Sequence, residues 1–133
     1  MQLQSPRVLY IEDHADTREL VTLLLTQKSY EVITGDSIES GIALASDGKF
    51  DLYLLDSWLP DGSGLELCEK IRQFDKTTPI LFYSAAAYAS DRELALKCGA
   101  QAYMIKPSQP SDLCRLVSEL IENSRSRFSR AAH

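Results

Sequence analysis

Five short apolar runs recur along the chain and predict β-strands at 7–11, 31–34, 51–55, 79–83 and 102–105. Three of these runs are apolar without alternation, which is typical of strands that are covered on both faces. Between the runs, apolar residues return with helical spacing, and the clearest stripe is Leu113, Leu116, Val117, Leu120 and Ile121. Because strands and helices alternate, the pattern predicts a parallel sheet with helices on both of its faces.

The predicted helices have recognisable ends. Ser63 and Ser90 are each followed three residues later by a glutamate, so both fit the capping box of a helix N-terminus. Gly48 and Gly99 stand where a left-handed residue would end a helix. The segment 20–25 is apolar nearly all round, and we expect that helix to be well buried.

The composition is that of one ordinary globular domain. The chain has 133 residues, of which 44% are hydrophobic and 25% are charged. We predict a single domain over 6–122 and a serine- and arginine-rich tail or linker stub at 123–133. Cys68, Cys98 and Cys114 are far apart and none belongs to a CxxC pair, which predicts structural thiols rather than disulfides or a zinc site.

Charge and hydropathy exclude two classes of partner. The net charge is −5, and the one basic cluster, Arg125, Arg127 and Arg130, lies in the tail, so we predict no direct binding to nucleic acid. No apolar run approaches the ~20 residues needed to span a bilayer. The N-terminus has no signal-peptide character. The sequence therefore predicts a soluble cytoplasmic protein with no membrane partner.

Polar side chains follow four of the five predicted strands. Glu12 and Asp13 come after the first strand, Asp56 after the third, Ser84 after the fourth and Lys106 after the fifth. The carboxyl ends of parallel strands meet at one edge of a sheet, where such folds bind ligands. Two carboxylates about 4 Å apart repel by about 4 kcal/mol at an effective dielectric of about 20, so a divalent cation such as Mg²⁺ would stabilise the cluster. A lone strand-end aspartate is usually a helix cap, but capping does not explain all of these residues together.

At these residues the sequence resembles the response-regulator receiver family, of the chemotaxis-regulator-like kind. The matching segments are 8–13, 51–56 with Pro60 and Gly62, 80–85 and 103–107, and the resemblance covers roughly residues 6–122. It implies a doubly wound, five-stranded parallel sheet of the (βα)5 flavodoxin-like type with strand order 2-1-3-4-5. It also implies a part in two-component or phosphorelay signalling.

The resemblance assigns a role to each residue of the cluster. Asp56 would be the phosphoacceptor, and Lys106 would pair with the phosphoryl oxygens. Mg²⁺ or Mn²⁺ would be held by Asp13, Asp56, the main-chain carbonyl of Trp58 and, partly through water, Glu12. The chain would then catalyse only its own phosphorylation and dephosphorylation and would not be an enzyme in the ordinary sense.

The same resemblance implies a conformational switch. Ser84 would donate a hydrogen bond to the phosphoryl group, and Tyr103 would change rotamer to follow it. The alternative for Tyr103 is a half-buried strand aromatic, because aromatics favour strands. The Lys106–Pro107 bond would be cis. We further expect Trp58 to shield the phosphoryl group from water, while Ala86 has no polar group with which to orient that water.

Partners and alternatives follow from this family. A histidine kinase or histidine phosphotransfer protein would supply the phosphoryl group, and a downstream effector protein or an output domain elsewhere in a longer protein would respond. A homodimer that forms through the fourth and fifth helices is compatible with the family, but no sequence feature supports it. The leading alternative is a phosphorylation-independent interaction module of the same fold. A flavin carrier or small-molecule enzyme is a weaker one, since Glu12 and Asp13 would repel a phosphate and no glycine-rich phosphate loop is present.

Overall fold

The computed structural model describes residues 5–131, with side chains up to Ser126. This part of the chain contains seven strands and five helices. The strands are β1 (Arg7–Ile11), β2 (Glu31–Gly35), β3 (Leu52–Leu55), β4 (Trp58–Leu59), β5 (Gly62–Ser63), β6 (Ile80–Ser84) and β7 (Ala102–Ile105). The helices are α1 (Ala15–Gln27), α2 (Ile38–Asp47), α3 (Gly64–Arg72), α4 (Ala89–Lys97) and α5 (Pro110–Ala131).

Five of the strands form one parallel sheet in the order β2-β1-β3-β6-β7. These are the five strands that the apolar runs predict, and each lies within one residue of its predicted bounds. Counted among themselves they have the order 2-1-3-4-5, so the predicted doubly wound, flavodoxin-like fold is confirmed. The remaining strands, β4 and β5, form a small antiparallel ribbon that the sequence pattern did not predict.

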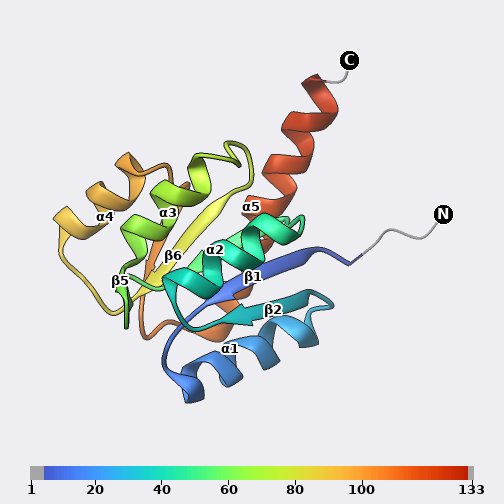
Figure 1. Ribbon diagram of the computed structural model, residues 1–133. Coiled ribbons are helices and arrows are strands. Elements are labelled where there is room, and N and C mark those ends of the chain that lie inside the picture. The colour runs from blue at the N-terminus through green and yellow to red at the C-terminus, as the bar shows by residue number, and fades with distance from the viewer. Residues whose placement is uncertain (1–4, 132–133) are drawn as a thin grey trace.

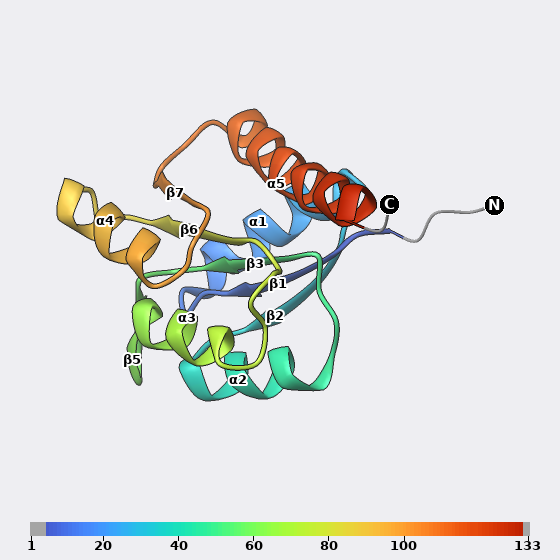
Figure 2. The same ribbon diagram turned by 90° about the horizontal axis from the view of Figure 1, so that it is seen from above.

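Helices cover both faces of the sheet. In the view from above, α1 and α5 lie on one side of it, and α2 and α3 lie on the other (Figure 2). Each face has its own hydrophobic core. Val21 and Leu25 of α1 and Val117 of α5 pack with one face, and Leu67 of α3 packs with the other, which α4 also covers. All four residues of β3 are buried, as expected for a central strand between two helical layers.

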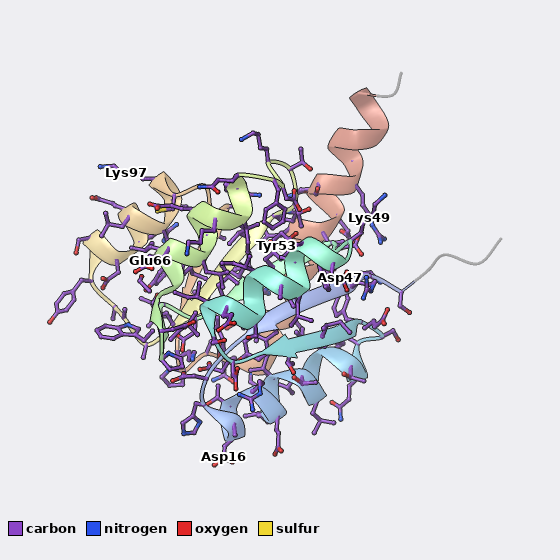
Figure 3. The ribbon with its side chains drawn as sticks, in the orientation of Figure 1. Asp16, Asp47, Lys49, Tyr53, Glu66 and Lys97 are labelled. Atoms are coloured by element: carbon purple, nitrogen blue, oxygen red, sulfur yellow. The ribbon has the colours of Figure 1, made fainter. Side chains whose placement is uncertain are left out.

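Side chains follow this layering. Tyr53 of β3 lies inside the molecule, where its hydroxyl donates to Asp75 Oδ2 at 2.7 Å. Charged residues such as Asp16, Asp47 and Lys97 lie at the periphery (Figure 3). The core is therefore apolar on both faces of the sheet, and polar chemistry is left to the strand ends and the outer faces of the helices.

One predicted helix is less buried than expected. Leu20 and Leu23 of α1 are 58% and 55% exposed, while Val21 and Leu25 are buried. The prediction that this helix is well buried was therefore wrong. Helix α1 lies in an outer layer, so only the stripe that faces the sheet is covered.

Two of the four predicted helix ends differ from the structure. Ser63 is the N-cap of α3 as predicted, but its Oγ accepts from the amide of Leu65 at 3.0 Å and not from that of Glu66, as the predicted capping box would require. The Ser90 cap was wrong, because α4 begins at Ala89 and the Asp91 carboxylate accepts from the amide of Tyr88 at 3.0 Å. Gly99 has a φ of 110°, which confirms the predicted positive φ at the end of α4. Gly48 has an extended backbone, with φ −144° and ψ 175°, so α2 ends without a left-handed residue.

The last helix extends beyond the predicted end of the domain. Helix α5 runs without interruption from Pro110 to Ala131, across the expected boundary at 122, and its last turns project beyond the sheet (Figure 1). Arg125 is still in contact with the body of the domain, because its guanidinium lies 3.3 Å from Asp51 Oδ1. The side chains of Arg127 and Arg130 lie outside the described residues.

Cys68 and Cys114 are buried, Cys98 is half-buried, and all three are free thiols. Among residues 5–131, no helix has the length and apolar character needed to cross a membrane.

Candidate functional site

Three carboxylates meet at the carboxyl edge of the sheet. The register of β1 and β3 pairs Ile11 with Leu55, so the next residues, Glu12 and Asp56, emerge side by side. Glu12, Asp13 and Asp56 each offer an oxygen within 4.8 Å of the others. Glu12 and Asp56 are only 1% and 6% exposed, whereas Asp13 is exposed. The predicted acidic cluster is thus present, with two buried members and one open to solvent.

Lys106 lies across this cluster. Its Nζ is hydrogen-bonded to Glu12 Oε1 and lies 3.7 Å from Asp56 Oδ2. The ammonium group also lies over the ring of Tyr83, 5.6 Å from the ring centroid. The Lys106–Pro107 bond is cis, as the family resemblance implied. One cation therefore serves two buried carboxylates.

The shortage of positive charge affects the protonation of the cluster. Burial raises the pKa of Asp56 to about 7; the neighbouring Glu12 carboxylate adds to this rise, and Lys106 opposes it. Burial also acts to raise the pKa of Glu12, but Asp56 and Lys106 together outweigh it and hold this pKa below its usual value. The pair thus keeps Glu12 ionised and favours a proton on Asp56 below neutral pH.

Ser84 and Tyr103 are both buried and meet at Ala86. Ser84 lies at the end of β6 and is fully buried; its Oγ accepts from the amide of Ala86 at 3.1 Å. The hydroxyl of Tyr103 donates to the carbonyl of Ala86 at 2.6 Å, and its ring stacks on Phe82. The two residues predicted to form the switch are thus joined through one backbone residue.

A cleft of about 780 Å³ opens above the cluster. Asp13, Asp56 and Lys106 line its floor, and the loop after β6 supplies part of its wall. Trp58 lines the same cleft and is 68% exposed, because it stands on the β4–β5 ribbon beyond the strand that ends at Leu55. Tyr88, which is 80% exposed, lines the cleft from the segment before α4.

Glycine allows the backbone to close around Asp56. A Cβ atom at Gly64 would lie 2.1 Å from the carbonyl oxygen of Asp56, which no real Cβ does. The first residue of α3 therefore packs directly against the main chain of Asp56. The side chain of Asp56 is held separately: its Oδ1 accepts from the amide of Ser57 at 2.7 Å, and its Oδ2 lies 3.7 Å from Lys106 Nζ.

The donor set fits a hard divalent cation. The three carboxylates offer only oxygen ligands, and their mutual repulsion is the feature that a bound cation relieves. Asp13, Asp56 and Glu12 could hold such an ion. Trp58 lines the cleft beside them, and the ligand role of its carbonyl stays a prediction.

The structure brings together most of the predicted site residues and adds some that the sequence analysis missed. Tyr10 donates its hydroxyl to Glu12 Oε1 at 3.3 Å, and Arg18 donates to the main-chain carbonyl of Glu12 at 2.8 Å. The signal for Tyr10 was its position two residues before Glu12, which places both side chains on one face of β1. His14 opens α1 as an N-cap, since its Nδ1 accepts from the amide of Thr17 at 3.3 Å.

The fold and this cluster together define a flavodoxin-like α/β domain with an acidic site at the carboxyl edge of its sheet. The response regulator receiver domain family matches residues 8–118. The chain belongs to this family, which consists of phospho-accepting switch domains and serves two-component signalling.

Relatives and solved structures agree with this assignment. The chain is 34% identical over 132 residues to a probable transcriptional regulatory protein of Picosynechococcus sp., covering 94% of this chain and 52% of that protein. It is 36% identical over 119 residues to the cell cycle response regulator CtrA of Brucella ovis, covering 90% and 51%. The chain thus spans about half the length of each of these two relatives.

Two solved structures are similar over nearly their whole length. A CheY-like receiver domain protein from Methanospirillum hungatei has a TM-score of 0.89 and 27% identity, covering 92% of this chain and 98% of that one. The receiver domain of the sensor histidine kinase PA1611 from Pseudomonas aeruginosa, which has magnesium coordinated in its active-site cleft, has a TM-score of 0.83 and 25% identity, covering 89% and 98%.

Proposed function

We propose that Asp56 accepts a phosphoryl group from a phosphohistidine donor, with the help of Mg²⁺ or Mn²⁺. The observation that carries this proposal is the position of the Asp56 carboxylate. It lies at the floor of an open cleft, 3.7 Å from the Lys106 ammonium and within 4.8 Å of oxygens of Glu12 and Asp13. A nucleophile, a cation and metal ligands are therefore supplied together by three strand ends.

The transfer itself needs little from the protein beyond position and charge. A carboxylate oxygen of Asp56 forms a bond to phosphorus as the bond from phosphorus to the donor histidine breaks, and the imidazole leaves with the electron pair. Such a transfer depends on in-line approach and on neutralisation of the phosphoryl oxygens. A bound divalent ion would supply most of that positive charge. Lys106 would add its own, as a flexible point charge close to Asp56.

The proposed response to phosphorylation starts at Ser84 and Tyr103. Ser84 would leave the Ala86 amide and donate to a phosphoryl oxygen, and Tyr103 would follow because its hydroxyl is bonded to the same residue. The surface formed by α4, β7 and α5 would then differ between the two states. Trp58 would slow hydrolysis by covering the cleft, since it is large and mostly exposed at its rim.

Partners are part of this proposal. The donor would be a histidine kinase or histidine phosphotransfer protein, and the receiver of the signal would be an effector protein or an output domain of a longer chain. A homodimer through α4, β7 and α5 is a further form that this surface could take. Because phosphohistidine is made from ATP, we place the reaction in the cytoplasm.

The test is the intact mass of the protein after incubation with acetyl phosphate. We expect one phosphoryl adduct that requires Mg²⁺ and that is lost in Asp56→Asn. Asp51→Asn is a matched control, because Asp51 lies at the opposite end of β3. An adduct that persists in Asp56→Asn would refute the assignment of the acceptor.

The absence of any adduct from folded wild-type protein, with a phosphorylated histidine donor also failing, would favour the phosphorylation-independent interaction module. The observation against that alternative is that Asp13, Asp56 and Lys106 lie together, and that Ser84 is next to them, since its carbonyl accepts from the amide of Lys106 at 2.8 Å.

A further inference from the structure

A buried tyrosine lies directly beneath the acidic cluster. Tyr10 is 1% exposed, and its ring belongs to the core between the sheet and helices α1 and α5. Because Tyr10 and Glu12 are two residues apart, their side chains leave β1 on the same face. The phenol hydroxyl reaches Glu12 Oε1 at 3.3 Å. The surrounding core holds the ring, so the position of this hydroxyl is set by packing.

Glu12 depends on a small number of partners. Its carboxylate is almost completely buried, and Oε1 receives both the Tyr10 hydroxyl and the Lys106 ammonium. The other oxygen, Oε2, receives the amide of His14 at 3.3 Å. A buried ionised carboxylate that loses a hydrogen-bond donor is strongly destabilised.

Lys106 cannot serve Glu12 and a phosphoryl group equally well. In the proposed function, Lys106 turns toward the phosphoryl oxygens on Asp56, whose Oδ2 is already 3.7 Å from its Nζ. That movement weakens the bond to Glu12 Oε1. Among the side chains that the structure describes, the Tyr10 hydroxyl is then the donor that remains for that oxygen.

We propose that Tyr10 is a positioning residue for phosphoryl binding. Its hydroxyl keeps Glu12 in place and hydrogen-bonded when Lys106 moves to the phosphoryl group. This inference rests on the proposed function. The Tyr10 hydroxyl donates to Glu12 and acts through it. An ordinary core tyrosine would contribute to folding only, whereas a positioning tyrosine contributes more to the state in which Lys106 has moved.

The test compares Tyr10→Phe with wild type in the binding of a phosphoryl analogue. The probe is beryllium trifluoride with Mg²⁺, and the signal is the fluorescence of Trp58, which is the single tryptophan of the chain and lines the cleft. We expect Tyr10→Phe to bind the analogue about tenfold more weakly or worse, as for the loss of one hydrogen bond to a charged group. The matched control is Tyr53→Phe, which removes the hydroxyl of another fully buried strand tyrosine, bonded to Asp75 Oδ2 at 2.7 Å and outside the cleft.

A double-mutant cycle separates positioning from packing. In a Glu12→Gln background no buried charge is left to support, so we expect Tyr10→Phe to change analogue affinity by less than about twofold there. Equal losses in the two backgrounds, or equal losses in Tyr10→Phe and Tyr53→Phe, would overturn the inference.

Failure of this inference is distinguishable from failure of the proposed function. If wild-type protein binds no analogue and takes no phosphoryl group, the proposed function fails. If wild type binds and Tyr10→Phe binds as tightly, only the role of Tyr10 fails. Should Tyr10→Phe not fold, NMR of wild type decides: the Tyr10 hydroxyl proton should stay protected from exchange after the analogue is added, and rapid exchange would refute the proposal.

Discussion

The Tyr103 hydroxyl donates a hydrogen bond of 2.6 Å to the carbonyl of Ala86. The amide of Ala86 in turn donates to Ser84 Oγ at 3.1 Å. A single backbone residue therefore connects the Ser84 hydroxyl at the end of β6 to an aromatic side chain on the neighbouring strand β7. Any displacement of Ser84 acts on the segment that holds Tyr103, and this gives the proposed switch a physical connection.

Tyr103→Phe should loosen that connection without removing the ring that stacks on Phe82. The Ala86 carbonyl loses a donor, so we expect the free energy of unfolding to fall by about 1 kcal/mol. Amide hydrogen exchange across 85–88 should become faster. Tyr83→Phe is the control, because its hydroxyl bonds Ser108 and not Ala86. Equal exchange across 85–88 in the two variants would contradict the connection.

The metal-free protein should become less stable as pH rises from about 5 to 7. The pKa of Asp56 is raised in the folded state, to about 7 from an ordinary value of 3.8, so the folded protein binds more protons than the unfolded chain within this window. The free energy of unfolding then falls with rising pH, by at most about 1.4 kcal/mol per unit for one group. The lowered pKa of Glu12 has the opposite effect, but at lower pH, where its stabilisation is lost on acidification.

Urea denaturation in EDTA measures this slope, and the difference between wild type and Asp56→Asn isolates Asp56 from other titrating groups. Asp56→Asn should be the more stable protein at pH 7 and should lack the decline. Mg²⁺ should stabilise wild type increasingly as the pH rises through the Asp56 pKa of about 7, because fewer protons then have to be displaced from Asp56. Parallel curves for wild type and Asp56→Asn would show that Asp56 titrates normally.

Trp58→Asn should shorten the lifetime of the phosphorylated protein. The indole is 68% exposed at the rim of the cleft, so its removal opens a path for water and leaves the core unchanged. We expect hydrolysis to become several-fold faster, measured by the decay of the intact-mass adduct. Phe74→Asn is the control, because Phe74 is also exposed and does not line the cleft. An adduct that decays no faster in Trp58→Asn would refute the shielding role.

Gly64→Ala should disrupt the site from the backbone. The added methyl group would meet the carbonyl oxygen of Asp56 at 2.1 Å, and two segments of main chain would have to separate. Strain of this kind lowers the free energy of unfolding by roughly 1–3 kcal/mol. Gly48→Ala is the matched control, since its nearest contacts are side-chain atoms at 3.4 Å and its backbone is extended. Urea denaturation should find Gly48→Ala near wild type, and equal losses in both variants would contradict the explanation.

The parts of the fold that could be predicted are those that depend on local patterns. Buried parallel strands are continuous apolar runs, so the five strands of the main sheet were found within one residue. The exposure of Leu20 and Leu23 could not be predicted, because an apolar side chain does not report whether another layer covers it. The start of α4 was missed because Asp91 competes with Ser90 as a capping side chain, and the backbone path decides between them.

The sequence by itself determined the order of strands and helices and the chemistry at each strand end, because both are set by residues close together in the chain. This order is enough to assign Asp13, Asp56 and Lys106 to one edge of the sheet. Only the tertiary structure decided how the partners are shared: that Lys106 bonds Glu12 while lying near Asp56, and that Tyr10 supports Glu12 from below. Hydrogen bonds and pKa values in a buried cluster depend on distances of a few ångströms between separate strands, and sequence spacing does not contain those distances.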